Sequence, residues 1–231
     1  MKLISGPASP FGRKARVMVM ETELESKVEV LLIPPGQIAV QSMPHNPLGK
    51  VPTLCHGDVV VTEQAAVYMY AAELYPEAGL SPAVDDPLRG AYLRWMVFYG
   101  ACFEPAVVDH SMKREPAAYS MSPYGDFDTV INTINAQLAK GPYLLGERFT
   151  AADVLWGAAL DWITKFKLMP ETPQVRAYID RVMARPAMQR AQAADLALAA
   201  QQDAAKAAAS AAAPGARVRL SAIDGTAPRP R

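Results

Sequence analysis

The order of the predicted elements constrains the fold of this chain more than any other feature of its sequence. Up to about residue 76, strand-like and helix-like patterns alternate, whereas only helical patterns follow residue 87. A small α/β unit followed by an all-helical unit predicts two domains within these 231 residues. The expected fold class is therefore α/β plus all-α, with the order β-α-β-α-β-β-α in the first domain.

The first helix has the clearest start signal in the chain. Ser9 suits an N-cap and Pro10 suits the first helical position. Residues 56–58, His-Gly-Asp, have the signature of a tight hairpin turn between two strands. The first domain is expected to contain strands at residues 2–5, 28–33, 51–55 and 59–61 and helices at residues 10–24 and 63–75, with residues 37–50 mostly loop around one weak helix.

Changes in composition divide the chain into four expected parts. A first domain at residues 1–76, a linker at 77–86 rich in Pro and Asp, and a helical domain at 87–203 precede an extension at 204–231. The extension is Ala-rich up to residue 213, which favours helix, and its Pro- and Gly-rich remainder predicts a disordered tail. The helical domain is expected to hold helices at residues 88–114, 124–139, 151–168, 172–185 and 187–205.

Charge balance excludes several kinds of partner. The chain has 23 basic and 23 acidic residues, so no net field attracts nucleic acid or a membrane surface. The N-terminus has no signal-peptide pattern, and no apolar run approaches the roughly 20 residues that span a bilayer. A cytoplasmic protein with no nucleic-acid or membrane partner is expected.

The cysteines and histidines give no metal or disulfide pattern. Cys55 and Cys102 lie far apart, and neither belongs to a Cys-x-x-Cys pair. His45, His56 and His110 form no His-x-x-x-His motif. No metal cofactor is therefore expected, and a reducing compartment fits best.

Three local segments can carry chemistry, and each also has a purely structural interpretation. Ser9 can donate a hydrogen bond to an anion at the N-terminus of the first helix, where the dipole and free N–H groups also favour it, or it can act only as N-cap. Pro52 can be cis and expose the Val51 backbone to an extended ligand, or it can be an ordinary trans proline. Glu63 and Gln64 can hold the α-amino acid end of a γ-glutamyl peptide, or Thr62 can simply cap the helix that follows.

Taken together, these segments resemble the glutathione-binding domain of the cytosolic glutathione transferases. Residues 9–12, Ser-Pro-Phe-Gly, resemble the Cys-Pro-Phe segment of omega-class members and the active-site serine of zeta- and theta-type members. Residues 46–52, Asn-Pro-Leu-Gly-Lys-Val-Pro, resemble a frequent phrase of that family. The resemblance implies a serine-type, zeta-, theta- or omega-like bacterial member with a thioredoxin-like first domain and an all-helical bundle as the second.

The resemblance also implies roles for individual residues. Ser9 is the expected catalytic residue, which donates to the glutathione thiolate and lowers the pKa of that thiol. The family usually has Ser where this chain has Gln64, whose amide can still bond a carboxylate. The expected glutathione-binding residues are Phe11, Lys50, Val51, Pro52, Glu63 and Gln64.

The helical half contributes two further expectations. Residues 149–154 resemble the family's capping box and hydrophobic staple, with Thr150 as N-cap and Asp153 reaching back to it, and this box has a structural role only. Aromatic and apolar residues recur at helical spacing on the first long helix, which lines the electrophile pocket in the family. The expected pocket residues are Tyr92, Trp95, Met96, Tyr99 and Phe103, for which bundle core is the structural alternative.

The predicted function is conjugation of glutathione to a small apolar electrophile. Glutathione is then a co-substrate, and a homodimer is expected from the family. A glutathione-dependent isomerase or dehalogenase using the same site is the first alternative. The second is a non-catalytic adaptor that keeps the fold and binds a protein partner.

Overall fold

The computed structural model describes residues 1–7, 9–34, 36–115 and 117–212. The expected disordered tail, residues 214–231, therefore lies outside the described residues. The first part of the chain contains the elements β1 (Lys2–Ser5), α1 (Pro10–Glu21), β2 (Glu29–Leu32), α2 (Ile38–Ser42), β3 (Thr53–His56), β4 (Val59–Val61), α3 (Gln64–Leu74) and the short η1 (Pro76–Ala78).

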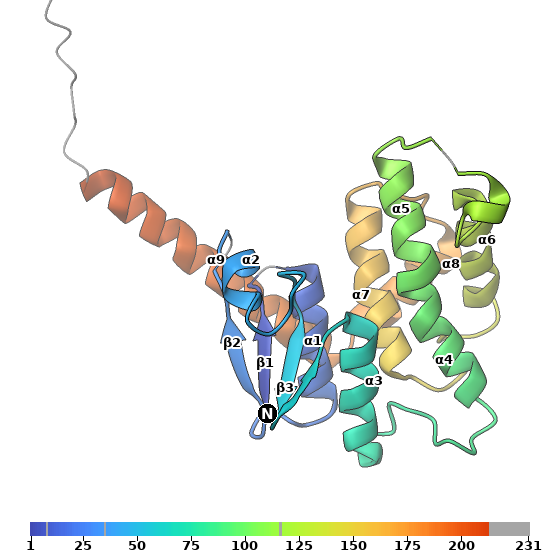
Figure 1. Cartoon of the computed structure of the whole chain (residues 1–231), viewed down its shortest axis with the longest axis horizontal. Coiled ribbons are helices and arrows are strands. Elements are labelled where there is room, and N and C mark those ends of the chain that lie inside the picture. Colours follow the sequence, from blue (N-terminus) through green and yellow to red (C-terminus); the bar gives the residue numbers. More distant parts are fainter. Residues whose placement is uncertain (8, 35, 116, 213–231) are drawn as a thin grey trace, which may run out of the picture.

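These elements form a thioredoxin-like domain around one four-stranded mixed sheet. The strand order is β2-β1-β3-β4. β1 pairs with β2 in parallel and with β3 antiparallel, and β4 continues the sheet antiparallel to β3. α1 and α3 pack against each other and against the helical part of the molecule (Figure 1). The predicted α/β class and element order are confirmed.

The rest of the described chain is helical. It comprises α4 (Arg89–Phe98), η2 (Tyr99–Phe103), α5 (Glu104–Ser111), η3 (Tyr119–Met121), α6 (Phe127–Leu138), α7 (Ala151–Lys165), α8 (Pro173–Met183) and α9 (Pro186–Ala212). α7 runs through the middle of the bundle and packs on α1, α3, α4 and α8. α9 leaves the bundle and passes along α1, so that its C-terminal half extends away from both parts of the molecule (Figure 1).

One predicted helix is divided in the structure. Residues 88–114 were expected to form a continuous helix, but a π-helical turn, η2, separates α4 from α5. Pro105 lies at the second position of α5 and has no N–H to donate to the preceding turn, which accounts for the interruption. Tyr99 is the first residue of this π-helical turn and Glu104 is the residue after it, and both line a cavity beside α1.

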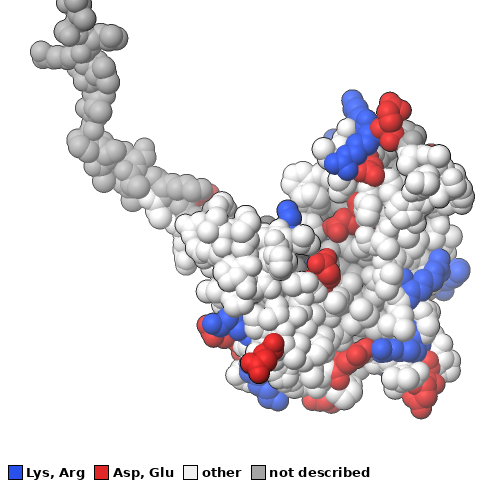
Figure 2. Space-filling model, viewed as in Figure 1, with Lys and Arg blue, Asp and Glu red and all other residues white. Residues whose placement is uncertain are grey.

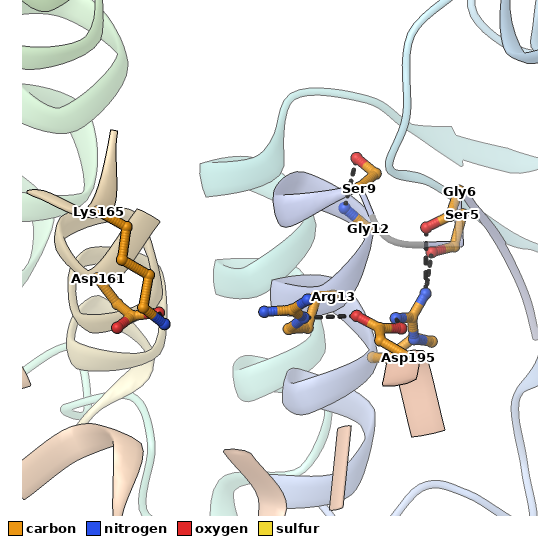
Figure 3. Close-up of polar contacts among 9 residues, drawn as sticks. Ser5, Gly6, Ser9, Gly12, Arg13, Asp161, Lys165 and Asp195 are labelled. Atoms are coloured by element: carbon orange, nitrogen blue, oxygen red, sulfur yellow. Dashed lines mark hydrogen bonds and ion pairs between the residues drawn. The ribbon is translucent and has the colours of Figure 1, made fainter. Parts of the chain in front are cut away.

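Ion pairs tie α9 to the start of α1. Asp195 of α9 is 5% exposed and pairs with both Arg13 and Arg16 of α1 (Figure 3). Arg16 also donates to Ser5 Oγ at 3.3 Å and to the Gly6 carbonyl at 3.2 Å. Arg16 therefore links the loop between β1 and α1 to Asp195 of the last helix.

Candidate active site

A cavity of about 570 Å³ lies between the two domains. This volume is typical of a small-molecule site. Figure 2 shows a hollow between the two parts of the molecule, with charged side chains beside it. The cavity is lined by Phe11, Asn46, Lys50, Val51, Pro52, Glu63, Gln64, Glu104, Pro105, Val108, Asp109 and Arg114. All six residues expected to bind glutathione are therefore among its lining residues.

Ser9 is the N-cap of α1. Its Oγ accepts a hydrogen bond from the backbone N–H of Gly12 at 3.3 Å (Figure 3). A Cβ placed on Gly6 would lie 3.2 Å from Ser9 Cβ and 3.7 Å from Val51 Cγ2, so Gly6 lets these two segments approach each other closely. Ser9 is not among the lining residues of the cavity in the described structure, whereas Phe11, two positions later, is.

The segment before β3 forms the second wall of the cavity. The peptide bond between Val51 and Pro52 is cis. Asn46 is buried, accepts from the Leu48 N–H at 3.0 Å and donates to the Lys50 carbonyl at 3.2 Å. These two bonds fix the loop that presents Lys50, Val51 and Pro52 to the cavity.

The start of α3 supplies the third wall. The helix begins one residue later than expected, with Glu63 rather than Thr62 as N-cap. Glu63 has φ 62°, a positive value that non-glycine residues rarely adopt and that also occurs at Glu23, Lys113 and Lys167. Gln64 Oε1 is buried and has no hydrogen-bond partner among the described residues, so an N–H of a bound ligand could satisfy it.

A chain of buried polar groups lies behind Glu104. Lys14 Nζ donates to Tyr99 Oη at 3.1 Å, and Tyr99 Oη donates to Glu104 Oε1 at 3.3 Å. Burial lowers the pKa of Lys14 to about 7, and burial also raises the pKa of Glu104. The sequence analysis missed Lys14 and Glu104, although Pro105 was a visible sign that the helix around Glu104 is irregular.

The predicted electrophile pocket needs correction. A smaller cavity of about 210 Å³ adjoins the first, and Tyr99 is the only one of the five predicted residues that lines it. The other four, Tyr92, Trp95, Met96 and Phe103, are at most 1% exposed and pack in the hydrophobic core. Trp156 of α7 covers this face, contacting the rings of Trp95, Tyr99 and Phe103.

The smaller cavity is instead built from α1, η2, α5 and α7. Phe11, Glu104 and Val108 line it and also line the larger cavity, so the two spaces share a wall. Most of its other lining residues are apolar. The full set is Pro10, Phe11, Lys14, Tyr99, Glu104, Val107, Val108, Ser111, Ala159, Trp162, Ile163 and Leu168.

The capping box at the start of α7 is present and lies away from both cavities. Asp153 Oδ2 accepts from the Thr150 N–H at 2.8 Å and from the Thr150 hydroxyl at 3.2 Å. Asp153 Oδ1 accepts from the Leu144 N–H and the Tyr178 hydroxyl, each at 2.9 Å. The box therefore also joins α7 to α8 and to the loop before it.

The described residues hold no cluster of three or more His, Cys, Asp or Glu side chains that could bind a metal ion. Cys55 Sγ lies 3.9 Å from His45 Nδ1, and Cys102 is half-buried. Among the helices of the described ranges, none has both the length and the apolar character needed to cross a bilayer.

Comparison with known proteins identifies the same two-part organisation. The family description "Glutathione S-transferase, N-terminal domain" matches residues 3–79, and "Glutathione S-transferase, C-terminal domain" matches residues 107–186. Glutathione S-transferase F14 of Arabidopsis thaliana is 29% identical over 62% of each chain. A glutathione S-transferase of Hyoscyamus muticus is 27% identical over 83% of this chain and 97% of its own.

Solved structures agree in fold along most of the chain. A glutathione transferase from Methylococcus capsulatus str. Bath superposes with a TM-score of 0.69 at 28% identity, covering 84% of this chain and 98% of its own. A sphingomonad glutathione S-transferase complexed with glutathione gives 0.67 at 25% identity, with the same coverage. With both domain descriptions matched in order and the fold shared with these structures, this chain belongs to the glutathione S-transferase family.

Proposed function

We propose that this protein is a glutathione transferase that binds glutathione in the larger cavity and presents its thiolate to a small apolar electrophile. The observation that carries the proposal is the convergence of three segments, residues 9–12, 46–52 and 63–64, on one cavity between the domains. The sphingomonad relative, crystallised with glutathione, shares this fold over most of its length.

In this proposal Ser9 activates the thiol, as in a serine-type, zeta-, theta- or omega-like member. A hydroxyl at a helix N-terminus can donate to a thiolate, which the helix dipole also stabilises. Ser9 is the N-cap of α1, close to Gly6 and the Val51 segment. Because its Oγ accepts from Gly12 N–H, its own hydrogen remains available to donate.

The remaining contacts follow the polarity of glutathione. Glu63 pairs with the α-ammonium group, and Gln64 Oε1, which lacks a partner in the described structure, accepts from the same end of the ligand. The Val51 backbone pairs with the cysteinyl unit beside Pro52. Lys50 contacts the glycine carboxylate, and Phe11 packs against the ligand where the two cavities meet.

The electrophile occupies the smaller cavity. Its lining is mostly apolar and comes from α1, η2, α5 and α7. A space of about 210 Å³ suits a small ring or short chain rather than a large substrate. We place the second substrate there, in contact with Tyr99 and not with the four core residues of α4 and η2.

The protein works in this proposal as a cytoplasmic homodimer. β4 is an edge strand of the sheet, and its Val59 and Val60 are 49% and 47% exposed. An exposed apolar edge strand offers unpaired backbone groups and apolar side chains to which a second chain can bind. Light scattering should give twice the chain mass of 24.9 kDa, and a monomer at micromolar concentration would contradict the dimer.

Calorimetric titration with glutathione tests the binding site. Glu63→Ala should weaken binding about ten- to a hundredfold, because a charge-assisted hydrogen bond is worth roughly 1.5–3 kcal/mol. Glu73→Ala is the matched control, since Glu73 lies on the same helix but pairs with Arg89 at the surface. Binding that is equal in all three proteins would refute the role of Glu63, and a parent that binds no glutathione would refute the proposed function.

A further inference from the structure

A buried lysine lies at the boundary between the domains without an ion-pair partner. Lys14 is 1% exposed, and among the described residues no carboxylate lies within 4 Å of its Nζ. Its contacts are the 3.1 Å hydrogen bond to Tyr99 Oη and the rings of Phe11 and Tyr99, at 5.0 and 4.8 Å from Nζ to the ring centroids. Burying an ammonium group is costly, and a methionine of similar length would fill the same space without that cost.

The hydrogen bonds that start at Lys14 end at the cavities. The Tyr99 hydroxyl accepts a hydrogen bond from Lys14 Nζ and donates one to Glu104 Oε1 at 3.3 Å. Glu104 lines both the larger and the smaller cavity, with Phe11 and Val108 as the other shared residues. It is therefore the one titratable side chain of the described structure on the wall between the two proposed substrates.

The backbone around this chain of groups is also unusual. Tyr99 is the first residue of the π-helical turn η2 and Glu104 directly follows the turn; turns of this kind are rare and occur frequently at functional sites. Lys14 comes from α1, more than eighty residues earlier in the sequence. The irregular turn thus allows Lys14, Tyr99 and Glu104, which come from three elements, to form one chain of hydrogen bonds. Packing of the hydrophobic core alone does not require such a chain.

The groups around Glu104 act on its pKa in both directions, and on balance the pKa lies above its ordinary value, which favours the protonated carboxyl. Burial raises the pKa of Glu104, and Glu63, across the larger cavity, raises it further. Lys14 and the Tyr99 hydroxyl act in the opposite direction. Tyr68 of α3 is a buried phenol whose own pKa is raised well above its ordinary value, so it remains neutral.

We propose that Glu104 is a catalytic acid that delivers a proton to the second substrate, with Tyr99 and Lys14 as positioning residues behind it. This inference rests on the proposed glutathione transferase function. It applies to electrophiles whose carbon skeleton gains a hydrogen as the thiol adds, such as conjugated ketones. For aryl halides the leaving group departs instead, and no such proton is needed.

The step balances without any further reactant. The thiolate sulfur forms a bond to the β-carbon of the ketone, and the electron pair of the carbon–carbon double bond moves to the α-carbon. The proton on Glu104 then transfers to that α-carbon. The proton that glutathione released on ionising returns the Glu104 carboxylate to its neutral form, so the sum is addition of one thiol across one double bond.

The test compares two electrophiles in Glu104→Gln. Benzylideneacetone requires a proton at carbon, and chlorodinitrobenzene does not. A positioned general acid contributes about a hundredfold or more. We expect kcat with benzylideneacetone to fall by about that factor, and by at least about tenfold more than kcat with chlorodinitrobenzene. Glu73→Gln, a surface carboxylate on α3, should leave both rates unchanged.

The pH profile separates a catalytic from a structural role. A general acid must be protonated, so the parent rate with benzylideneacetone should fall on the alkaline side, and Glu104→Gln should abolish that limb. Lys14→Met and Tyr99→Phe each remove a group that lowers the pKa of Glu104, and so each should move the limb to higher pH. Melting temperatures close to the parent would show that the variants are folded.

Two results would overturn the inference alone. One is an equal loss with both electrophiles in Glu104→Gln, and the other is an alkaline limb that does not move in Lys14→Met and Tyr99→Phe. A parent that turns over chlorodinitrobenzene but not benzylideneacetone would also overturn it while leaving the proposed function standing. A parent that fails to bind glutathione would overturn both.

Discussion

The carboxylate of Asp153 holds together the start of α7, the loop before it and α8, and its removal should be costly for stability. It is 0% exposed and accepts four hydrogen bonds. In Asp153→Ala all four donors lose this acceptor at once, namely the Leu144 N–H, the Tyr178 hydroxyl, and the N–H and hydroxyl of Thr150. An unsatisfied buried group costs about 1–3 kcal/mol, and the space left by the carboxylate allows some relaxation. We expect a loss of about 3–5 kcal/mol in the free energy of unfolding.

Two milder variants give a graded series. Asp153→Asn keeps Oδ1 for Leu144 and Tyr178 but turns an NH₂ toward the Thr150 N–H, so about 1–3 kcal/mol should be lost. Thr150→Ala removes only the capping hydroxyl and should cost about 0.5–2 kcal/mol.

Urea unfolding with linear extrapolation measures these values. The assay for chemistry is glutathione conjugation at a temperature where each variant is fully folded. Neither cavity includes Thr150 or Asp153, so kcat should stay close to the parent. A loss below about 1 kcal/mol in Asp153→Ala, or a large fall in kcat in a variant that unfolds normally, would show that the box has been misinterpreted.

Three further predictions concern other contacts. Burial raises the pKa of Asp153 from 3.8 to about 6, so the native state binds this proton more tightly than the unfolded state does. The free energy of unfolding should therefore decline as pH rises from about 4 to 6. Asp153→Asn should flatten this decline in urea unfolding, and an unchanged slope would contradict the shift. Asp195→Asn leaves the buried Arg16 without its carboxylate and should lower the free energy of unfolding by about 3–5 kcal/mol. Hydrogen exchange in α9 should become faster in this variant, and unaltered exchange would contradict the role of Asp195 in holding α9 on α1. Ser9→Cys should form a mixed disulfide with oxidised glutathione, detectable by mass spectrometry, and a thiol that never reacts would place Ser9 outside the reach of the glutathione sulfur.

Local signals accounted for the parts of the fold that the sequence predicted well. The N-cap at Ser9 and the capping box at Thr150 depend on residues within one helical turn of each other, so their spacing alone specifies the structure. The hairpin of β3 and β4 also follows from a short turn signature. The alternation of strands and helices then fixed the α/β class of the first domain.

The electrophile pocket was predicted less well because periodicity identifies an apolar face but not what covers it. The stripe on α4 and η2 is real, yet Trp156 of α7, some fifty residues later, packs on it and makes it core. No local pattern contains that contact. Of the five residues of this stripe that were expected to line the pocket, Tyr99 alone lines the smaller cavity.

Lys14 and the N-cap of α3 escaped prediction for a related reason. A lysine on an amphipathic helix is normally solvated, but this one is buried and contacts Tyr99 of the helical domain, far along the sequence. Thr62 is by composition the better N-cap, but the structure gives that place to Glu63, in a left-handed conformation that local propensity disfavours. Departures of this kind from local rules are expected at functional sites.

Titration of the bound thiol tests the central claim, that Ser9 stabilises the glutathione thiolate. Ultraviolet difference spectroscopy follows the ionisation of glutathione on the parent, on Ser9→Ala and on Ser9→Thr, which keeps both the cap and the hydroxyl. The parent and Ser9→Thr should bind glutathione with a thiol pKa well below the ordinary cysteine value of about 8.5. In Ser9→Ala the pKa should rise toward that value while glutathione still binds. The same thiol pKa in all three proteins would contradict the claim and leave Ser9 as the N-cap of α1 alone.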